Sequence, residues 1–251
     1  MLPEYPPLFW VCASVAVVMI GIAKAGFGGG VGVIGTPLMA LTIPVGDAVA
    51  LLLPLLILCD VFSVWHYRTR FHRRSVALLL PGAVAGVVAG TAFFGYFLNN
   101  QRILQQGVGA IALLFVVYQV IRALATGALE RRHPRAPEGV VMGAVAGFTS
   151  TLAHAGGPPV AIYVLPQRLP RDLFVGTTVV FFAALNLIKL GPYWHLGLIH
   201  VGNLAAIALL APLTFVGVRL GIYLNGHFTD RWFNRVVYTL LFATGVHLLL
   251  K

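Results

Sequence analysis

The stretch KAGFGGGVGVIGTPLMALTIP, residues 24–44, places six glycines from Gly26 to Gly35 in an otherwise apolar sequence. Glycine weakens a helix by about 1 kcal/mol per residue relative to alanine, so a run this dense interrupts any helix that enters it. Lys24 stands at its beginning, and Pro37 follows the glycines. The stretch predicts a broken transmembrane helix, followed by a short new helix.

The composition around this stretch is typical of an integral membrane protein. Of 251 residues, 59% are hydrophobic and only 10% are charged, with a mean hydropathy of +0.91, whereas a soluble domain is about 25% charged. Cys12 and Cys59 both lie in apolar runs, which argues against a disulfide framework or a cysteine-based metal site. We therefore expect an all-α polytopic protein, a single transmembrane domain over residues 1–251, with no cofactor and no metal.

Ten apolar segments divide the chain. A helix that crosses a hydrocarbon core of about 30 Å needs about 20 residues, and most of the segments reach or approach this length. Two do not, and each of these follows a break rich in glycine or proline. We expect about eight full spans plus two short segments that either cross or re-enter. The segments are 8–23, 31–43, 46–65, 76–97, 103–121, 138–153, 157–166, 173–190, 202–222 and 234–250, of which 31–43 and 157–166 are short.

The second half of the chain repeats the pattern of the first. GFGGGVGVIGTPLMALTIP at 26–44 resembles GFTSTLAHAGGPPVAIYVLP at 147–166 in the placement of glycine, phenylalanine and proline. GYFLN at 95–99 returns as GIYLN at 221–225, at a spacing of 126 residues. Because the matches occur in the same order, we interpret them as an internal duplication.

The duplication divides the chain into repeats 8–124 and 138–250, joined by a basic linker, 125–137. Positively charged loops face the cytoplasm, and placing four basic segments there leaves only Arg102 and Lys251 in loops on the other side. The net charge of +10 is then topogenic, with no nucleic-acid partner, and both termini lie outside. The first repeat begins outside and the second inside, which makes an inverted repeat, as in many secondary transporters. The twelve cytoplasmic arginines are Arg68, Arg70, Arg73, Arg74, Arg122, Arg131, Arg132, Arg135, Arg168, Arg171, Arg231 and Arg235.

The two breaks are interpreted as halves of an anion site. A helix that starts after a break has N–H groups without intrahelical partners, and their partial positive charge favours an anion. Pro158 and Pro159 suit the first turn of such a helix. The alternative is that glycines only allow close helix packing, which is how we interpret GAVAGVVAG at 82–90. Residues assigned to the substrate at the breaks are Gly28, Gly29, Gly30, Gly32 and Thr36 in the first repeat, and Gly156 and Gly157 in the second.

Charged and polar side chains near the breaks complete the candidate site. Lys24 and Lys189 either attract the anion or extend to the membrane interface. His154 either meets the anion, carries a coupling proton or is structural. Asp60, a carboxylate at membrane depth, is either a coupling-proton site or polar wall of the pathway, or it pairs with Arg68 or another basic residue near the cytoplasmic end. The remaining substrate candidates are Thr149, Ser150, Thr151 and Asn186, although hydroxyls in such spans often bond their own helix instead.

The motifs GFGGGVGVIGTPL and STLAHAGGPP, together with the LN turns near residues 99 and 225, resemble those of the TauE/SafE sulfite exporter family. The resemblance extends over essentially the whole chain. It implies a transporter of the bacterial inner membrane for sulfite, organosulfonates or related small sulfur or carboxylate anions. The second repeat lacks the dense glycines of the first, so the two half-sites are expected to be unequal.

We therefore predict a multi-pass secondary transporter, not an enzyme, that moves a small anion by alternating access, with coupling to protons through Asp60 or His154 as one option. An anion channel that uses the breaks as a filter is the alternative, and an intramembrane enzyme is the least favoured. The expected partners are the anion and the lipid bilayer. The sequence leaves open the identity of the anion, the direction of transport, the coupling ion and assembly into a homo-oligomer.

Overall fold

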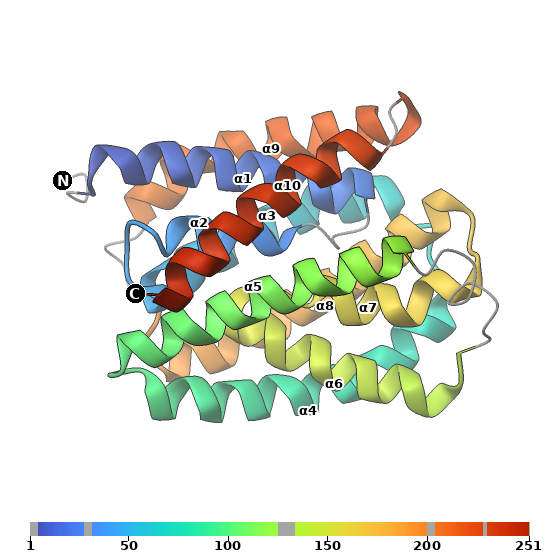
Figure 1. Ribbon diagram of the computed structural model, residues 1–251. Coiled ribbons are helices and arrows are strands. Elements are labelled where there is room, and N and C mark those ends of the chain that lie inside the picture. Colours follow the sequence, from blue (N-terminus) through green and yellow to red (C-terminus); the bar gives the residue numbers. More distant parts are fainter. Residues whose placement is uncertain (1–4, 28–31, 125–133, 200–203, 228–229, 251) are drawn as a thin grey trace.

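The structure is a computed structural model that describes residues 5–27, 32–124, 134–199, 204–227 and 230–250. Within these residues the chain is all-helical (Figure 1), as predicted. Two 3₁₀ turns, η1 (Gly32–Ile34) and η3 (Leu165–Gln167), adjoin the short helices. The α-helices are α1 (Pro7–Phe27), α2 (Gly35–Met39), α3 (Val45–Tyr67), α4 (Arg73–Phe97), α5 (Gln101–Leu124), α6 (Ala136–Ala153), α7 (Gly157–Val164), α8 (Arg171–His195), α9 (Leu204–His227) and α10 (Asp230–Leu250).

Six of the described helices are long and apolar enough to cross a membrane: α1, α3, α4, α5, α8 and α9. This finding supports the predicted multi-pass membrane protein. The expected eight full spans would also include α6 and α10, and that number stays a prediction. The two short apolar runs form α2, with five residues, and α7, with eight, which are far shorter than a span of about 20 residues.

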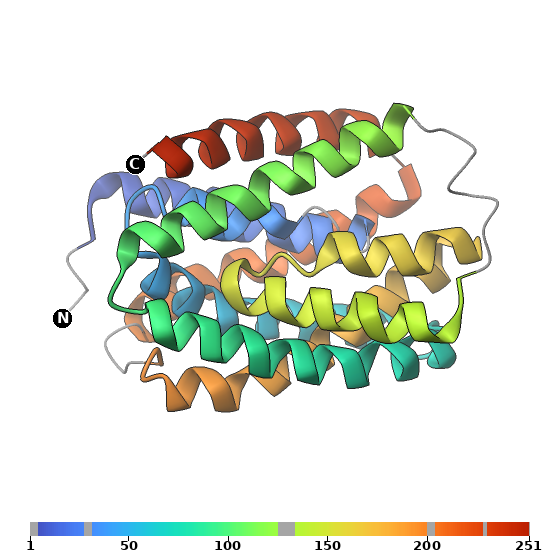
Figure 2. The same ribbon diagram turned by 60° about the horizontal axis from the view of Figure 1, so that its bottom comes forward.

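The short helices turn back instead of continuing the helices before them. Figure 2 shows α7 returning toward the end of the bundle at which α6 begins. In the first half, a Cβ added to Gly35 in α2 would lie 3.3 Å from Cγ1 of Ile20, a residue well before the end of α1. The chain has therefore turned back along α1 by the start of α2. The chain therefore re-enters at both breaks, and α3 and α8 start at the same ends of the bundle as α1 and α6, respectively (Figure 1).

Two helix pairs pack at very short range because glycines face backbone. Between α4 and α6, a Cβ on Gly82 or Gly86 would overlap the carbonyl oxygens of Val140 and Ala144. Between α1 and α9, a Cβ on Gly21 would lie 2.8 Å from the carbonyl carbon of Gly217. The interpretation of run 82–90 as a packing surface is confirmed, since its glycines allow the backbones to approach closely.

Polar contacts join the loops at one end of the bundle. Arg70 Nη1 lies 2.8 Å from Asp172 Oδ2, and the backbone N–H of His72 donates to Thr177 Oγ1 at 2.8 Å. The loop after α3 and the start of α8 therefore meet, whereas α1 begins and α10 ends at the opposite end (Figure 1). The predicted grouping of these two basic loops on one side of the membrane agrees with this arrangement.

Candidate functional site

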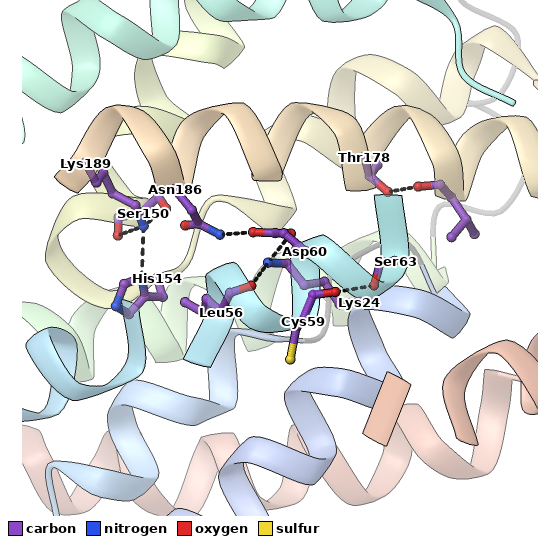
Figure 3. A network of polar contacts seen from close by, with 11 residues as sticks. Lys24, Leu56, Cys59, Asp60, Ser63, Ser150, His154, Thr178, Asn186 and Lys189 are labelled. Atoms are coloured by element: carbon purple, nitrogen blue, oxygen red, sulfur yellow. Dashed lines mark hydrogen bonds and ion pairs between the residues drawn. The ribbon is translucent and has the colours of Figure 1, made fainter. Parts of the chain in front are cut away.

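Lys24, Asp60 and Asn186 form a chain of contacts in the middle of the bundle (Figure 3). The Lys24 ammonium, from α1, lies 2.5 Å from Asp60 Oδ1 and donates to Leu56 O at 3.2 Å, both on α3. From α8, Asn186 Nδ2 donates to Asp60 Oδ2 at 2.7 Å. All three polar side chains are buried, with Lys24 4% exposed. Both oxygens of the carboxylate are therefore occupied, one by a charge and one by an amide.

Lys189, one turn beyond Asn186 on α8, forms a second cluster (Figure 3). It is fully buried, and its ammonium contacts Ser150 Oγ at 2.9 Å, Ser150 O at 3.2 Å and His154 Nδ1 at 2.9 Å. An ammonium has three N–H donors, and these contacts provide one acceptor for each. None of these described contacts is a carboxylate oxygen, so in this part of the chain Lys189 lacks the direct negative partner that Lys24 has.

His154 ends α6 in an unusual backbone conformation that aims its ring at Lys189. Its φ of 51° and ψ of 31° lie in the left-handed region, where glycine is the usual residue. Its backbone N–H donates to Ser150 O, and that of Ala155 donates to Thr149 O, which closes the last turn of α6. The ring Nε2 lies 2.9 Å from Val49 O. Because a carbonyl only accepts, this contact assigns the proton to Nε2 and leaves Nδ1 as the acceptor for Lys189.

A small cavity lies between the two lysine clusters. Its volume is about 20 Å³, which accommodates a water molecule, since a water needs about 10–15 Å³ of such volume. A larger ligand therefore requires the surrounding helices to move apart. The cavity walls bring together an ammonium, a hydroxyl and a carboxamide, which can donate hydrogen bonds to an anion, and an imidazole whose N–H is bonded to Val49 O. The lining residues are Ile20, Lys24, Leu56, Ser150, His154, Phe182 and Asn186.

The glycines assigned to the substrate are positioned differently from one another. Gly28, Gly29 and Gly30 lie outside the described residues, and Gly32 begins η1. Gly157 is buried at the start of α7. Gly156 faces packed atoms, because an added Cβ would lie 3.0 Å from both Ala146 O and Phe182 Cε1. The role of these backbone groups in anion binding therefore stays a prediction.

The threonines fall into two groups. Thr149 Oγ1 donates to Val145 O at 2.8 Å and Thr151 Oγ1 donates to Gly147 O at 2.9 Å, so both hydroxyls bond their own helix. Thr36 Oγ1, in α2, is buried and has no hydrogen-bond partner among the described residues. A buried hydroxyl without a partner is unusual in a native protein, and Thr36 stays a substrate candidate for that reason.

One expectation about the charged residues holds in part, and another needs correction. Asp60 does pair with a basic residue, but this partner is Lys24, whereas the guanidinium of Arg68 lies 5.1 Å from the centroid of the Trp65 ring. Lys24 and Lys189 do not extend to the membrane interface, because both are buried with their ammonium groups bonded inside the bundle. The sequence placed Lys24 before the first break and Lys189 at the end of its span, but their partners depend on which helices pack together.

Sequence reasoning also missed two tyrosines. Tyr67 Oη donates to Ala25 O at 2.9 Å, and Tyr193 Oη donates to Thr151 O at 2.7 Å. Each bond ties the end of α3 or α8 to the last turn of the helix before a break. The signal was present, because the two tyrosines are 126 residues apart, the spacing of the LN motifs.

The fold and this site define a multi-pass helical membrane protein with interrupted helices and paired charges at membrane depth, an arrangement that marks transport pathways. The chain belongs to the sulfite exporter TauE/SafE family, whose family model matches residues 13–248. A search of curated proteins and a search of solved structures gave no match.

Proposed function

We propose that the protein is a secondary transporter that moves a small anion across the bacterial inner membrane. The substrate is sulfite, an organosulfonate or a related small sulfur or carboxylate anion. The family supports the substrate class. The observation that carries the proposal for this chain is the buried ammonium of Lys189, which has three neutral acceptors and no carboxylate among its described contacts.

A buried charge without a counter-charge is costly. An anion in the adjoining cavity would lower that cost, because Ser150 and His154 both contact Lys189 and line the cavity. Lys24 and Asn186 line the same cavity from the other cluster. We assign attraction of the anion to the lysines and its orientation to the hydroxyl and carboxamide groups, whereas His154 holds the Lys189 ammonium in place.

Alternating access between two inverted repeats is the mechanism that we propose. Corresponding residues 126 positions apart make corresponding contacts: Tyr67 bonds Ala25, and Tyr193 bonds Thr151. Asp60 and Asn186 are also 126 positions apart, and they bond each other where α3 meets α8. A shift of 126 residues relates α4 to α9 and α1 to α6. The close pair α4–α6 therefore corresponds to the close pair α9–α1. These relationships support a pseudo-two-fold axis through the α3–α8 contact.

The direction of the helices supports the opposite orientation of the halves. The ends of α1 and α3 lie together at the Tyr67–Ala25 bond, and those of α6 and α8 at the Tyr193–Thr151 bond. Arg70, just after α3, meets Asp172 in the first turn of α8, so α3 and α8 run antiparallel. We place the end with these arginines in the cytoplasm, according to the positive-inside rule, and both termini outside.

Flux through reconstituted vesicles tests the proposal. A carrier exchanges labelled sulfite for unlabelled sulfite across the membrane and saturates with concentration, whereas an anion channel passes current without counter-exchange. Lys189→Met should abolish exchange while the purified protein remains monodisperse. Sulfite flux in the wild type without counter-exchange would favour the channel, and the absence of any anion flux would contradict transport.

A further inference from the structure

The charges of the two lysine clusters do not balance. With Lys189 as an ammonium, the form that its three acceptors favour, Lys24 and Lys189 contribute two positive charges, and the Asp60 carboxylate contributes one negative charge. The contacts of the His154 ring assign it as neutral, since Nε2 faces a carbonyl and Nδ1 accepts from Lys189. The described buried cluster therefore carries one net positive charge.

From this imbalance we infer that the site matches one negative charge of the ligand, and that a doubly charged anion binds only together with a proton on Asp60. The inference rests on the proposed function and deepens it by naming the charge class of the substrate. A singly charged anion neutralises the cluster as it stands. A doubly charged anion leaves one negative charge in excess inside the bundle, where an unbalanced charge is costly.

Asp60 is the group positioned to take up the proton. Its carboxylate holds the Lys24 ammonium at 2.5 Å, and Lys24 lines the cavity. A dianion in the cavity competes with Asp60 for that ammonium. A proton on Asp60 ends the competition, frees Lys24 for the ligand and leaves the bond from Asn186 Nδ2 in place, because a protonated carboxyl still accepts.

The surroundings of Asp60 make it the single acid of the described cluster. The charged groups that act on it are Lys24 from α1 and Lys189 from α8, with Asn186 as its neutral partner. Cys59, a buried thiol, precedes it on α3. Within the described residues, three other helices pack on α3. Of these, α2 carries no titratable side chain, α9 carries Arg219, Tyr223 and His227, and α5 carries Arg102, Tyr118 and Arg122. His154 is poorly placed to take up the proton, because its Nε2 already donates to Val49 O and its Nδ1 accepts from the Lys189 ammonium.

Methanesulfonate and sulfate form a matched pair of probes. Both are tetrahedral, both present sulfonyl oxygens, and they differ in a methyl group against a charged oxygen. Calorimetric titration of the purified protein in buffers of different ionisation enthalpy counts the protons taken up with each anion, and sulfite serves as the reference ligand. We expect one proton per sulfate and none per methanesulfonate, with the Kd of sulfate rising about tenfold per pH unit above the protonation range of Asp60.

Two aspartate variants locate the proton. Asp60→Asn should abolish proton uptake with sulfate and remove the pH dependence of its Kd. Asp172→Asn changes the exposed carboxylate that pairs with Arg70 and should leave proton uptake as in the wild type. If Asp60→Asn does not fold, the comparison of the two anions on the wild type still decides the matter.

The possible results separate this inference from the proposed function. Equal proton uptake for both anions, no uptake with sulfate, or sulfite binding without any sulfate binding at low pH overturns the charge rule and leaves the transporter standing. Proton uptake with sulfate that persists in Asp60→Asn also overturns it. If neither sulfite nor either probe binds, the proposed function is overturned together with the inference.

Discussion

Tyr67 and Tyr193 make equivalent hydrogen bonds in the two halves of the molecule, since each hydroxyl donates to the carbonyl of the residue 42 positions earlier. Both acceptors, Ala25 and Thr151, lie in the last turn of a helix before a break. Carbonyls at a helix end lack intrahelical partners, and the two tyrosines that satisfy these carbonyls are themselves buried. The two tyrosines therefore hold the broken ends in place.

Removing one of these hydroxyls should destabilise the protein. Tyr67→Phe and Tyr193→Phe each leave a buried carbonyl unsatisfied, which costs about 1–3 kcal/mol. The effect should be larger for Tyr67, because its hydroxyl also accepts from Asn225 Nδ2 at 3.1 Å. Thermal unfolding in detergent measures both, with Tyr96→Phe, at an exposed tyrosine, as the matched control. A Tm change no larger than that of Tyr96→Phe would show that the bonds do not stabilise the breaks.

The buried and exposed ion pairs should respond very differently to the loss of a lysine or arginine. Lys24→Met leaves Asp60 buried without its counter-charge, and breaking a buried pair in this way costs about 3–5 kcal/mol. The double variant Lys24→Met/Asp60→Asn should recover much of that loss, because neither charge remains. A double-mutant cycle on the unfolding free energy gives the coupling.

Arg70→Met is the control for that cycle. Its pair with Asp172 is more than half exposed on both sides, and such pairs contribute about 0–1 kcal/mol. If Lys24→Met cost no more than Arg70→Met, the buried contact would not be an ion pair in the folded protein.

Glycines at the break and in the packing surface should be distinguishable by valine substitution. Gly157→Val puts a branched side chain at the start of α7, where a backbone donor is proposed to meet the anion. Loss of one donor to a charged group costs about 1.5–3 kcal/mol. The Kd should therefore rise about 10- to 150-fold. Gly86→Val should lower Tm far more than it weakens binding, because its Cβ would overlap Ala144 O. Measuring Kd and Tm for both variants tests the assignment. Normal sulfite binding by a folded Gly157→Val protein would remove Gly157 from the site.

Single cysteines test the orientation in the membrane. In a background with Cys12 and Cys59 replaced by serine, Arg70→Cys should react with an impermeant maleimide only after the cytoplasmic side is opened. Asn100→Cys, in the exposed turn between α4 and α5, should react from the periplasmic side in intact cells. The reverse pattern of labelling would invert the topology.

The sequence predicted the features that depend on local composition. Dense glycines and prolines indicated both breaks, and the spacing of 126 residues between the LN motifs is also the spacing between Asp60 and Asn186. The pairing of Lys24 with Asp60 could not be predicted, because it depends on how α1 and α3 pack around α2. The left-handed conformation of His154 could not be predicted either. The residue that ends a helix in this conformation is normally glycine, and here the first glycine after α6 is Gly156, two residues later.

The close packing of α1 against α9 has a consequence for biogenesis. The glycine face of α1, with Gly21 and Gly26, is covered by Gly217 and Gly221, which the ribosome adds almost two hundred residues later. During synthesis α1 therefore enters the bilayer before α9 exists, and until α9 arrives this face contacts lipid or a chaperone. Contacts between residues so far apart in sequence form slowly, so assembly of the bundle completes only after nearly the whole chain has entered the membrane.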